Sequence, residues 1–442
     1  MNKKSIALDT VTLQRIFLIF FCFNLAITAA MVFASRGASM SAVLFGGEAG
    51  EKDFFMDFLN AIRSASSKTV YVHSDEVYPP LFVVLFKVLG LFLPASITGL
   101  DFDSRYKMQG NQLCMLMFVM VFAVCLVFLY RLPARRYVRA EDRSTVVPLL
   151  VLMLLSYPVI YCVERGNIAM FVLLLVMFWL WNRSSEKKNV RLAADIAFAC
   201  AVGLAIWPVV FILIPISERR FKEIKRPLIL SACVTVLPLL VIIIIDSLIS
   251  EVSLGAAFAA SAVGIGRRLA AFYVKSAAEV NMESFGTADL LFFIFGKNFP
   301  LAASAVICFI FEILAAVAVF FTDKLWLKTL LISYLALNLP GGSSVYMGVL
   351  LIIPLYIWLF EEKDRRPLDL LPLLFFIILI SPLPPVLYLL DGVRAALGDR
   401  FTLSLNKLVA PVVLNLGVWV IAALNIISSR KKAKTVNADT EK

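Results

Sequence analysis

The sequence predicts an all-α polytopic membrane protein, a bundle of about 10–12 transmembrane helices with two sizeable extracytoplasmic loops. Of the 442 residues, 61% are hydrophobic and only 17% are charged, and the mean hydropathy is +0.89. Soluble domains contain about 45–50% apolar and about 25% charged residues, so this chain has too few polar residues to cover a water-soluble surface. Apolar segments recur almost to the end of the chain, which predicts one membrane domain over residues 1–428.

A spanning helix needs about 20 mainly apolar residues. The segments that meet this description are 14–34, 112–130, 147–163, 168–182, 227–249, 299–321, 329–340, 345–360, 368–390 and 407–428. Two further stretches are ambiguous. Residues 79–97 are short and contain Lys87. Residues 192–216 contain Pro208 and have basic residues at both ends, so they form either one span or a broken, re-entrant pair of half-helices.

Four basic clusters determine the predicted orientation. The chain has 42 Lys and Arg residues against 31 Asp and Glu residues, a net charge of +11. The basic residues lie in short clusters between apolar segments, which is the positive-inside bias of cytoplasmic loops and gives no support to nucleic-acid binding. The clusters are Arg131–Arg143, Arg183–Arg191, Arg219–Arg226 and a predicted disordered cytoplasmic tail at 429–442. Ala34–Tyr78 and Glu251–Asn298 then form the extracytoplasmic loops.

The start of the chain presents a conflict. A cytoplasmic N-terminus and a cytoplasmic Arg131 cluster require an even number of crossings between them, yet 14–34, 79–97 and 112–130 make three. We therefore expect residues 79–97 to enter the membrane only partly. The alternative is that one cluster breaks the positive-inside rule.

The first outer loop contains the strongest candidates for catalytic chemistry. Asp53 and Asp57 are four residues apart, so on a helix they share one face, beside an apolar face that includes Phe54 and Phe58. This pattern is typical of an amphipathic helix lying on the outer leaflet, where a partly desolvated aspartate can act as a general base. The alternative is that both aspartates form only the solvated face of a loop helix.

Two arginine-containing segments are candidates for binding an anion. Arg165 precedes the start of a helix, where a guanidinium and backbone N–H groups can converge on a phosphate. Arg267 and Arg268 lie in the second outer loop, against the positive-inside bias. The alternatives are an interface anchor at Arg165 and a solvated pair at the other two. The one histidine, His73, and the seven scattered cysteines give no metal-ligand spacing, so we expect no metal.

Four segments, in this order along the chain, are similar to those of a known family. They are Asp53–Phe58, Tyr71 with Tyr78–Leu81, Arg165–Asn167, and Gly203–Pro208 followed by Arg219 and Arg220. In these residues the sequence resembles the polyprenol-phosphate-dependent membrane glycosyltransferases of glycosyltransferase family 87, in the GT-C superfamily. The resemblance implies a GT-C-like helical bundle, placed in the plasma membrane and surrounded by membrane lipids.

The resemblance also implies a reaction and a site. A sugar, such as the hexose mannose, passes from a polyprenyl-phosphate-linked donor to a lipid or glycan acceptor of the cell envelope at the extracytoplasmic face, with no cofactor. The residues it implicates are Asp53, and second Asp57, as the base, Arg165, Arg267 and Arg268 at the donor phosphate, and Tyr78, Asn167 and Tyr346 at the substrate.

Two other functions stay open at this point. A transporter or flippase of lipid-linked glycans is marked by ionisable residues within spans, and Glu312 and Asp246 are the candidates here. A polysaccharide polymerase or ligase shares the large outer loops and the need for cations.

Overall fold

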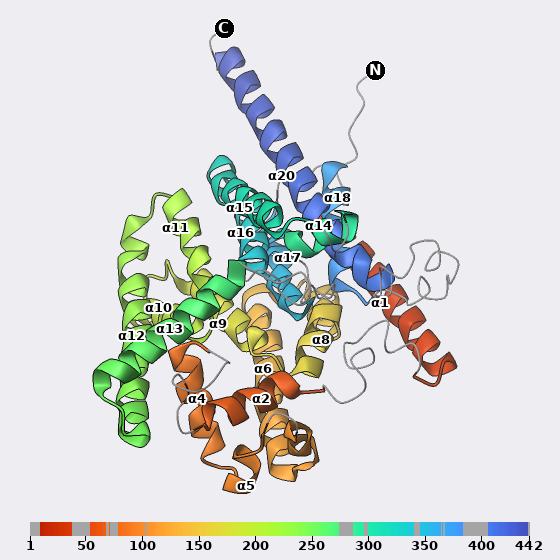
Figure 1. The fold of residues 1–442 in the computed structure, drawn as a ribbon. Helices are drawn as coiled ribbons and strands as arrows, with labels where there is room; N and C mark the ends of the chain where they lie inside the picture. Colours follow the sequence, from red (N-terminus) through yellow and green to blue (C-terminus); the bar gives the residue numbers. More distant parts are fainter. Residues whose placement is uncertain are drawn as a thin grey trace. The chain divides into compact units, whose positions relative to one another are not determined.

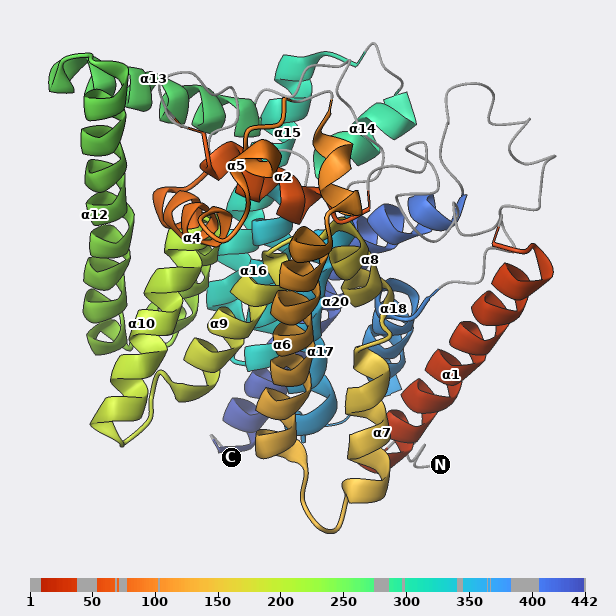
Figure 2. The same cartoon turned by 90° about the horizontal axis from the view of Figure 1, so that it is seen from below.

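The computed structural model describes residues 9–37, 54–67, 70, 78–101, 104–273, 286–295, 299–339, 345–363, 365, 367–382 and 405–440. Every regular element in these residues is a helix, as Figures 1 and 2 show, which confirms the predicted all-α class. Within these ranges, six helical stretches are long and apolar enough to span a membrane: Thr10–Ala34, Gln112–Tyr137, Arg143–Arg165, Phe221–Ile249, Ala302–Phe321 and Val409–Ser428.

The chain forms two compact units, and α6 (Gln112–Tyr137) and α8 (Tyr157–Arg165) run across the boundary between them. One unit comprises Leu44–Leu132 and Tyr161–Val274. Its other elements are α2 (Met56–Ala65), α4 (Pro80–Gly90), α5 (Ala95–Thr98), η2 (Arg105–Gly110), α9 (Ala169–Asn182), α10 (Lys188–Leu204), η3 (Trp207–Ile212), α11 (Leu213–Ser217), η4 (Phe221–Glu223), α12 (Lys225–Ser250) and α13 (Leu254–Tyr273).

The second unit comprises Met1–Val43, Pro133–Ile160 and Lys275–Lys442. Its elements are α1 (Thr10–Ala34), α7 (Arg143–Met153), α14 (Thr287–Phe295), α15 (Leu301–Ala318), η5 (Val319–Phe321), α16 (Leu325–Asn338), η6 (Val345–Leu351), α17 (Ile352–Tyr356), η7 (Ile357–Glu361), η8 (Pro367–Asp369), α18 (Leu370–Ile380) and α20 (Leu405–Thr440). The helix α20 continues into the segment that we predicted to be a disordered tail.

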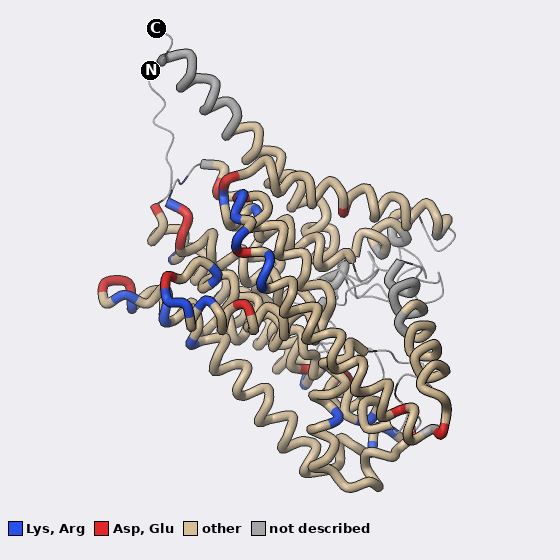
Figure 3. The backbone as a smooth tube through the Cα atoms, turned by 90° about the vertical axis from the view of Figure 1, so that its left-hand side faces the viewer, with Lys and Arg blue, Asp and Glu red and all other residues tan. Residues whose placement is uncertain are grey.

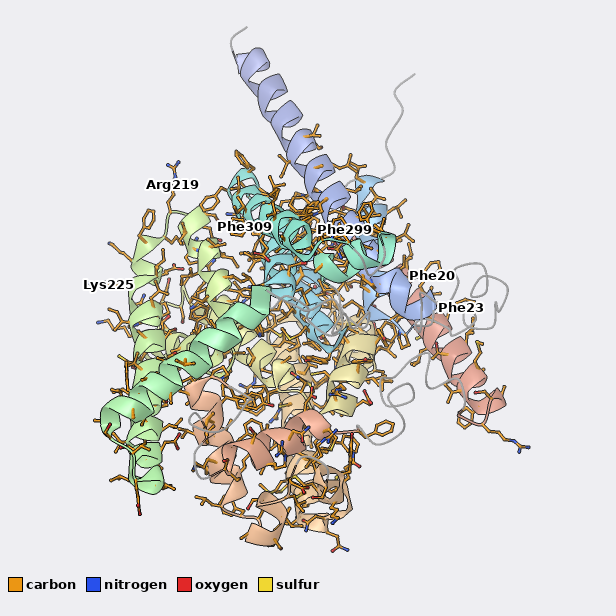
Figure 4. The ribbon with its side chains drawn as sticks, viewed as in Figure 1. Phe20, Phe23, Arg219, Lys225, Phe299 and Phe309 are labelled. Carbon is orange, nitrogen blue, oxygen red and sulfur yellow. The ribbon has the colours of Figure 1, made fainter. Side chains whose placement is uncertain are left out.

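The long helices carry large apolar side chains on their exposed surfaces. Phe20 and Phe23 on α1 are 48% and 58% exposed and project from the ribbon in Figure 4, and Leu237 on α12 is 61% exposed. Charged residues gather near the helix ends, and long stretches between them are uncharged (Figure 3). Exposure of such apolar surfaces to water is unfavourable in free energy, whereas contact with lipid tails is not. These faces are therefore suited to contact with the bilayer.

Residues 79–97 form only short helices in the structure. The helix α4 has only 11 residues, which corresponds to a rise of about 16 Å, against a hydrocarbon core of about 30 Å. Leu91 follows as a turn, and α5 adds just one further short turn. The segment is therefore too short to cross as one helix, in agreement with partial entry.

Residues 188–217 form a helical hairpin, as in the re-entrant alternative of the sequence analysis. The helix α10 ends at Leu204, Ala205 is extended, and the chain returns through η3 and α11. Arg183, just before α10, donates hydrogen bonds to Glu218 (2.7 Å) and Glu223 (3.2 Å), just after α11. Both ends of the hairpin thus lie together, and two of the basic clusters meet there.

Candidate active site

The turn between α8 and α9 has a backbone conformation that favours glycine. Gly166 has φ of +70°, its N–H donates to the carbonyl of Val163 (2.9 Å), and the N–H of Asn167 donates to that of Cys162 (2.9 Å). These two bonds form a Schellman motif, which satisfies the last carbonyls of α8. The sequence Arg165-Gly166-Asn167 is therefore first of all a helix ending.

A second constraint at Gly166 comes from the segment that enters α2. A Cβ atom on Gly166 would lie 2.9 Å from Cβ of Phe58 and 3.0 Å from the carbonyl oxygen of Phe55. The N–H of Phe55 donates to the carbonyl of Glu164 at 2.7 Å. The absence of a side chain at position 166 thus lets the first outer segment lie directly against the turn.

The apolar side of α2 is buried in the protein, which corrects our placement of this helix on the outer leaflet. Phe58 and Ile62 are 1% and 0% exposed. The ring of Phe58 packs edge-on against Phe86 of α4 (5.5 Å between centroids) and Phe118 of α6 (5.8 Å). The sequence pattern was right about amphipathicity, but protein side chains rather than lipid cover the apolar face.

Asp57 lies on the first turn of α2 and is held by two side chains from the α8–α9 turn. Arg165 donates through Nη2 to Oδ1 of Asp57 at 2.5 Å, and Asn167 donates through Nδ2 to Oδ2 at 2.8 Å. The Asp57 and Arg165 side chains are 22% and 13% exposed. The Oδ1 atom of Asn167 in turn accepts from the N–H of Ala169 at 2.9 Å, which fixes this amide at the start of α9.

This arrangement orients a carboxylate and leaves it able to accept further hydrogen bonds. Each carboxylate oxygen has two acceptor positions, and Arg165 and Asn167 account for one on each oxygen. A guanidinium carries five N–H donors, so one arginine can hold a carboxylate and a phosphate together. The Asp57 carboxylate can thus accept a hydrogen bond from a hydroxyl group while Arg165 and Asn167 hold it in place.

The site lies at one end of α9, and the Arg183 cluster lies at the other. The helix α9 has 14 residues from Ala169 to Asn182, a length of about 21 Å. If the basic cluster faces the cytoplasm, as the positive-inside rule requires, Asp57 and Arg165 belong to the extracytoplasmic end.

The structure brings together three of the predicted site residues, Asp57, Arg165 and Asn167. Tyr78 lies at the entry to α4, where its ring stacks on Phe82 with 4.4 Å between centroids. Arg267 and Arg268 lie on α13, and their side chains are outside the described part of the structure, as is all of Asp53. Tyr346 lies half-buried in η6 of the other compact unit.

Two residues that the sequence analysis missed position α2. Gln109 donates to the carbonyl of Phe54 at 2.6 Å, just before the helix, and Lys87 donates to the carbonyl of Ser67 at 3.1 Å, just after it. A lysine at a helix C-terminus also complements the helix dipole. No sequence signal identifies either pairing, because each depends on how distant segments pack.

Comparison with known protein families gives a match over part of the chain. Residues 77–273 match the family model described as glycosyltransferase family 87. This range contains Tyr78, Arg165 and Asn167 and begins after Asp57. No curated protein and no solved structure matches the sequence.

Proposed function

The chain contains a glycosyltransferase family 87 domain at residues 77–273, and on this premise we propose that it transfers a sugar from a polyprenyl-phosphate-linked donor to a lipid or glycan acceptor. The sugar is a hexose such as mannose, and the transfer takes place at the extracytoplasmic face of the plasma membrane. The observation that supports this proposal best is the Asp57 carboxylate, held by Arg165 and Asn167 at the end of α9 opposite the Arg183 cluster.

In the proposed reaction, Asp57 accepts the proton of the acceptor hydroxyl as its oxygen attacks C1 of the donor sugar. The bond between C1 and the phosphate oxygen breaks, the configuration at C1 inverts, and polyprenyl phosphate leaves with the bonding electron pair. Arg165 stabilises the negative charge on this leaving group. Asn167 keeps the carboxylate in the orientation that the attack requires.

We place Asp57 before Asp53 as the base, in the reverse of the order from the sequence. The geometry of Asp57 supports this order, because Arg165 and Asn167, from a distant segment, orient its two carboxylate oxygens.

The test uses purified protein in lipid nanodiscs with radiolabelled polyprenyl-phosphate hexoses and a membrane lipid extract as acceptor. We expect a labelled glycolipid product, and we expect Asp57→Asn to lower turnover by about 10²–10⁴-fold, the usual contribution of a general base. Asp53→Asn is the matched control, since it removes the same charge four residues earlier, and it should leave most turnover intact. If only Asp53→Asn abolishes turnover, the two roles are exchanged.

Reconstituted vesicles separate this function from its rivals. A transporter or flippase moves a lipid-linked glycan across the bilayer without extending it, whereas a transferase extends it without net movement. Movement without product formation from any polyprenyl-phosphate sugar would contradict the proposal.

A further inference from the structure

The turn between α11 and α12 comprises residues 219–225, and we name it the basic turn. It contains Arg219, Arg220, Lys222 and Lys225, and acidic residues are present at positions 218 and 223. Counted from the sequence, these acids could neutralise half of the positive charge. The structure distributes the charges differently.

Both acidic residues, Glu218 and Glu223, are paired with Arg183. Its side chain is only 6% exposed, lies over the Trp179 ring at 5.8 Å, and forms ion pairs with Glu218 (2.7 Å) and Glu223 (3.2 Å). Arg220 is 52% exposed and lies 3.6 Å and 3.5 Å from the same two carboxylates. The acidic residues therefore pair with the buried Arg183 and with its neighbour Arg220, and their own side chains are only 19% and 17% exposed.

Three cations of the basic turn point outward. Arg219, Lys222 and Lys225 are exposed, and none of the three has a side-chain ion pair or hydrogen bond to the described part of the chain. Figure 4 shows the Arg219 and Lys225 side chains projecting away from the ribbon. The turn thus presents a local positive surface, although its sequence is of mixed charge.

Apolar side chains adjoin these cations. Phe221, between Arg220 and Lys222, is 64% exposed, and Ile229 on the first turns of α12 is 52% exposed. Aromatic rings beside lysine and arginine at the end of a spanning helix are typical of the membrane–water interface. This combination is suited to a lipid surface, since a soluble acidic partner has no need for apolar contacts at the level of the helix ends.

The backbone at Arg219 gives an independent argument. Its φ is +58°, its N–H donates to the carbonyl of Ile216 (3.0 Å), and the N–H of Arg220 donates to that of Pro215 (2.8 Å). Arg219 therefore occupies the left-handed position of a Schellman motif, where glycine is the usual residue. A strained arginine that has no side-chain partner in the described structure suggests a partner outside the chain.

From these observations we propose that the basic turn binds the headgroups of anionic phospholipids in the leaflet that it faces. Arg219, Lys222 and Lys225 contact the lipid phosphates, and Phe221 enters the boundary between headgroups and acyl chains. This proposal does not depend on the glycosyl-transfer proposal, because it concerns lipid binding at the opposite end of the hairpin-containing unit from Asp57.

The experiment measures binding of short-chain phosphatidylglycerol to the full chain in neutral detergent by native mass spectrometry, with phosphatidylcholine as the zwitterionic comparison. The test variant is Arg219→Gly/Lys222→Gln/Lys225→Gln. The matched control is Arg131→Gln/Arg135→Gln/Arg139→Gln, which removes the same charge from exposed residues at another helix end. We expect about 100-fold weaker phosphatidylglycerol binding in the test variant, from roughly fivefold per basic residue, and less than about threefold change in the control.

Arg219→Gly alone separates a structural role from lipid binding. Because glycine relieves the left-handed strain, this variant should be at least as thermally stable as the wild type while binding phosphatidylglycerol about fivefold more weakly. Unchanged lipid binding in the triple variant would overturn the proposal, as would an equal loss in the control. Lower stability of Arg219→Gly with unchanged lipid binding would assign Arg219 to the fold instead.

Discussion

At the scale of single residues, the turn after α8 and the first turn of α2 constrain each other. Gly166 allows Phe55 and Phe58 to approach, and this approach brings Asp57 within hydrogen-bonding distance of Arg165 and Asn167. The three-residue segment Arg165-Gly166-Asn167 thus combines a helix ending with two polar contacts of the candidate site.

Gly166→Ala should destabilise the protein and reduce turnover, because alanine at φ of +70° is strained by about 1–2 kcal/mol and its Cβ would overlap Phe58. Gly37→Ala is the matched control: its φ is +89°, but no atom of the described residues lies within 4 Å of the added Cβ. We expect a lower thermal midpoint for both variants and lost turnover only for Gly166→Ala. Equal turnover in the two would contradict the role of the close approach.

Arg165→Lys should lower kcat/KM for the donor by about tenfold or more, since lysine keeps the charge but lacks the planar fork that holds two oxyanions. Donor titrations with the purified protein measure this effect. Arg136→Lys is a suitable control, because Arg136 also pairs with a carboxylate, Glu361 at 2.9 Å, in the other compact unit. Unchanged donor affinity in the Arg165→Lys variant would remove Arg165 from the phosphate site.

At the scale of elements, buried polar contacts determine where short helices pack. In one unit, Arg183 joins the two ends of the α10–α11 hairpin. In the other, Thr287 at the start of α14 donates its N–H to Asn338 of α16 (2.7 Å), and its hydroxyl lies 2.8 Å from Oδ1 of Asn415 on α20. Such contacts are specific because a buried polar group without a partner is costly.

Arg183→Ala should lower the free energy of unfolding by about 3 kcal/mol, because it leaves two largely buried carboxylates without their main cation. Arg220→Ala removes a half-exposed arginine from the same two carboxylates, at 3.5–3.6 Å, and should change stability by only about 0–1 kcal/mol. Denaturant titrations in mild detergent compare the two variants. Equal losses would show that burial does not distinguish these ion pairs.

At the scale of the whole molecule, orientation in the membrane connects the candidate site to its substrates. The proposed transfer at the extracytoplasmic face requires the α8–α9 turn, with Arg165 and Asn167, to face outward. The basic clusters at the opposite end of this unit predict that it does.

Single cysteines in a variant without native cysteines test this orientation. Gly110→Cys lies just before α6 on the Asp57 side and is exposed, and no atom of the described residues lies within 4 Å of its added Cβ. Glu186→Cys lies exposed between α9 and α10. An impermeant thiol reagent should label position 110 in intact cells and position 186 only after lysis. The reverse pattern would invert the topology and exclude the proposed reaction at the outer face.

The sequence by itself determined the all-α membrane class and the six long apolar helices, and it selected Asp57, Arg165 and Asn167 as candidate site residues. The class and the spans follow from the free energy of transferring each segment into lipid, and the helix endings follow from local sequence. Both depend little on distant residues. The short α4 and the hairpin at 188–217 could be predicted only as alternatives, because apolar length alone does not distinguish a full span from a partial one.

Only the tertiary structure decided which side chains meet. Asp57 and Arg165 are 108 residues apart in the sequence, and nothing in either segment alone selects the other. The structure likewise buried the apolar face of α2 under Phe86 and Phe118 rather than in lipid, and assigned Glu218 and Glu223 to Arg183. Ion pairs and ring contacts require a few ångströms of proximity, and packing of whole helices, rather than local sequence, supplies that proximity.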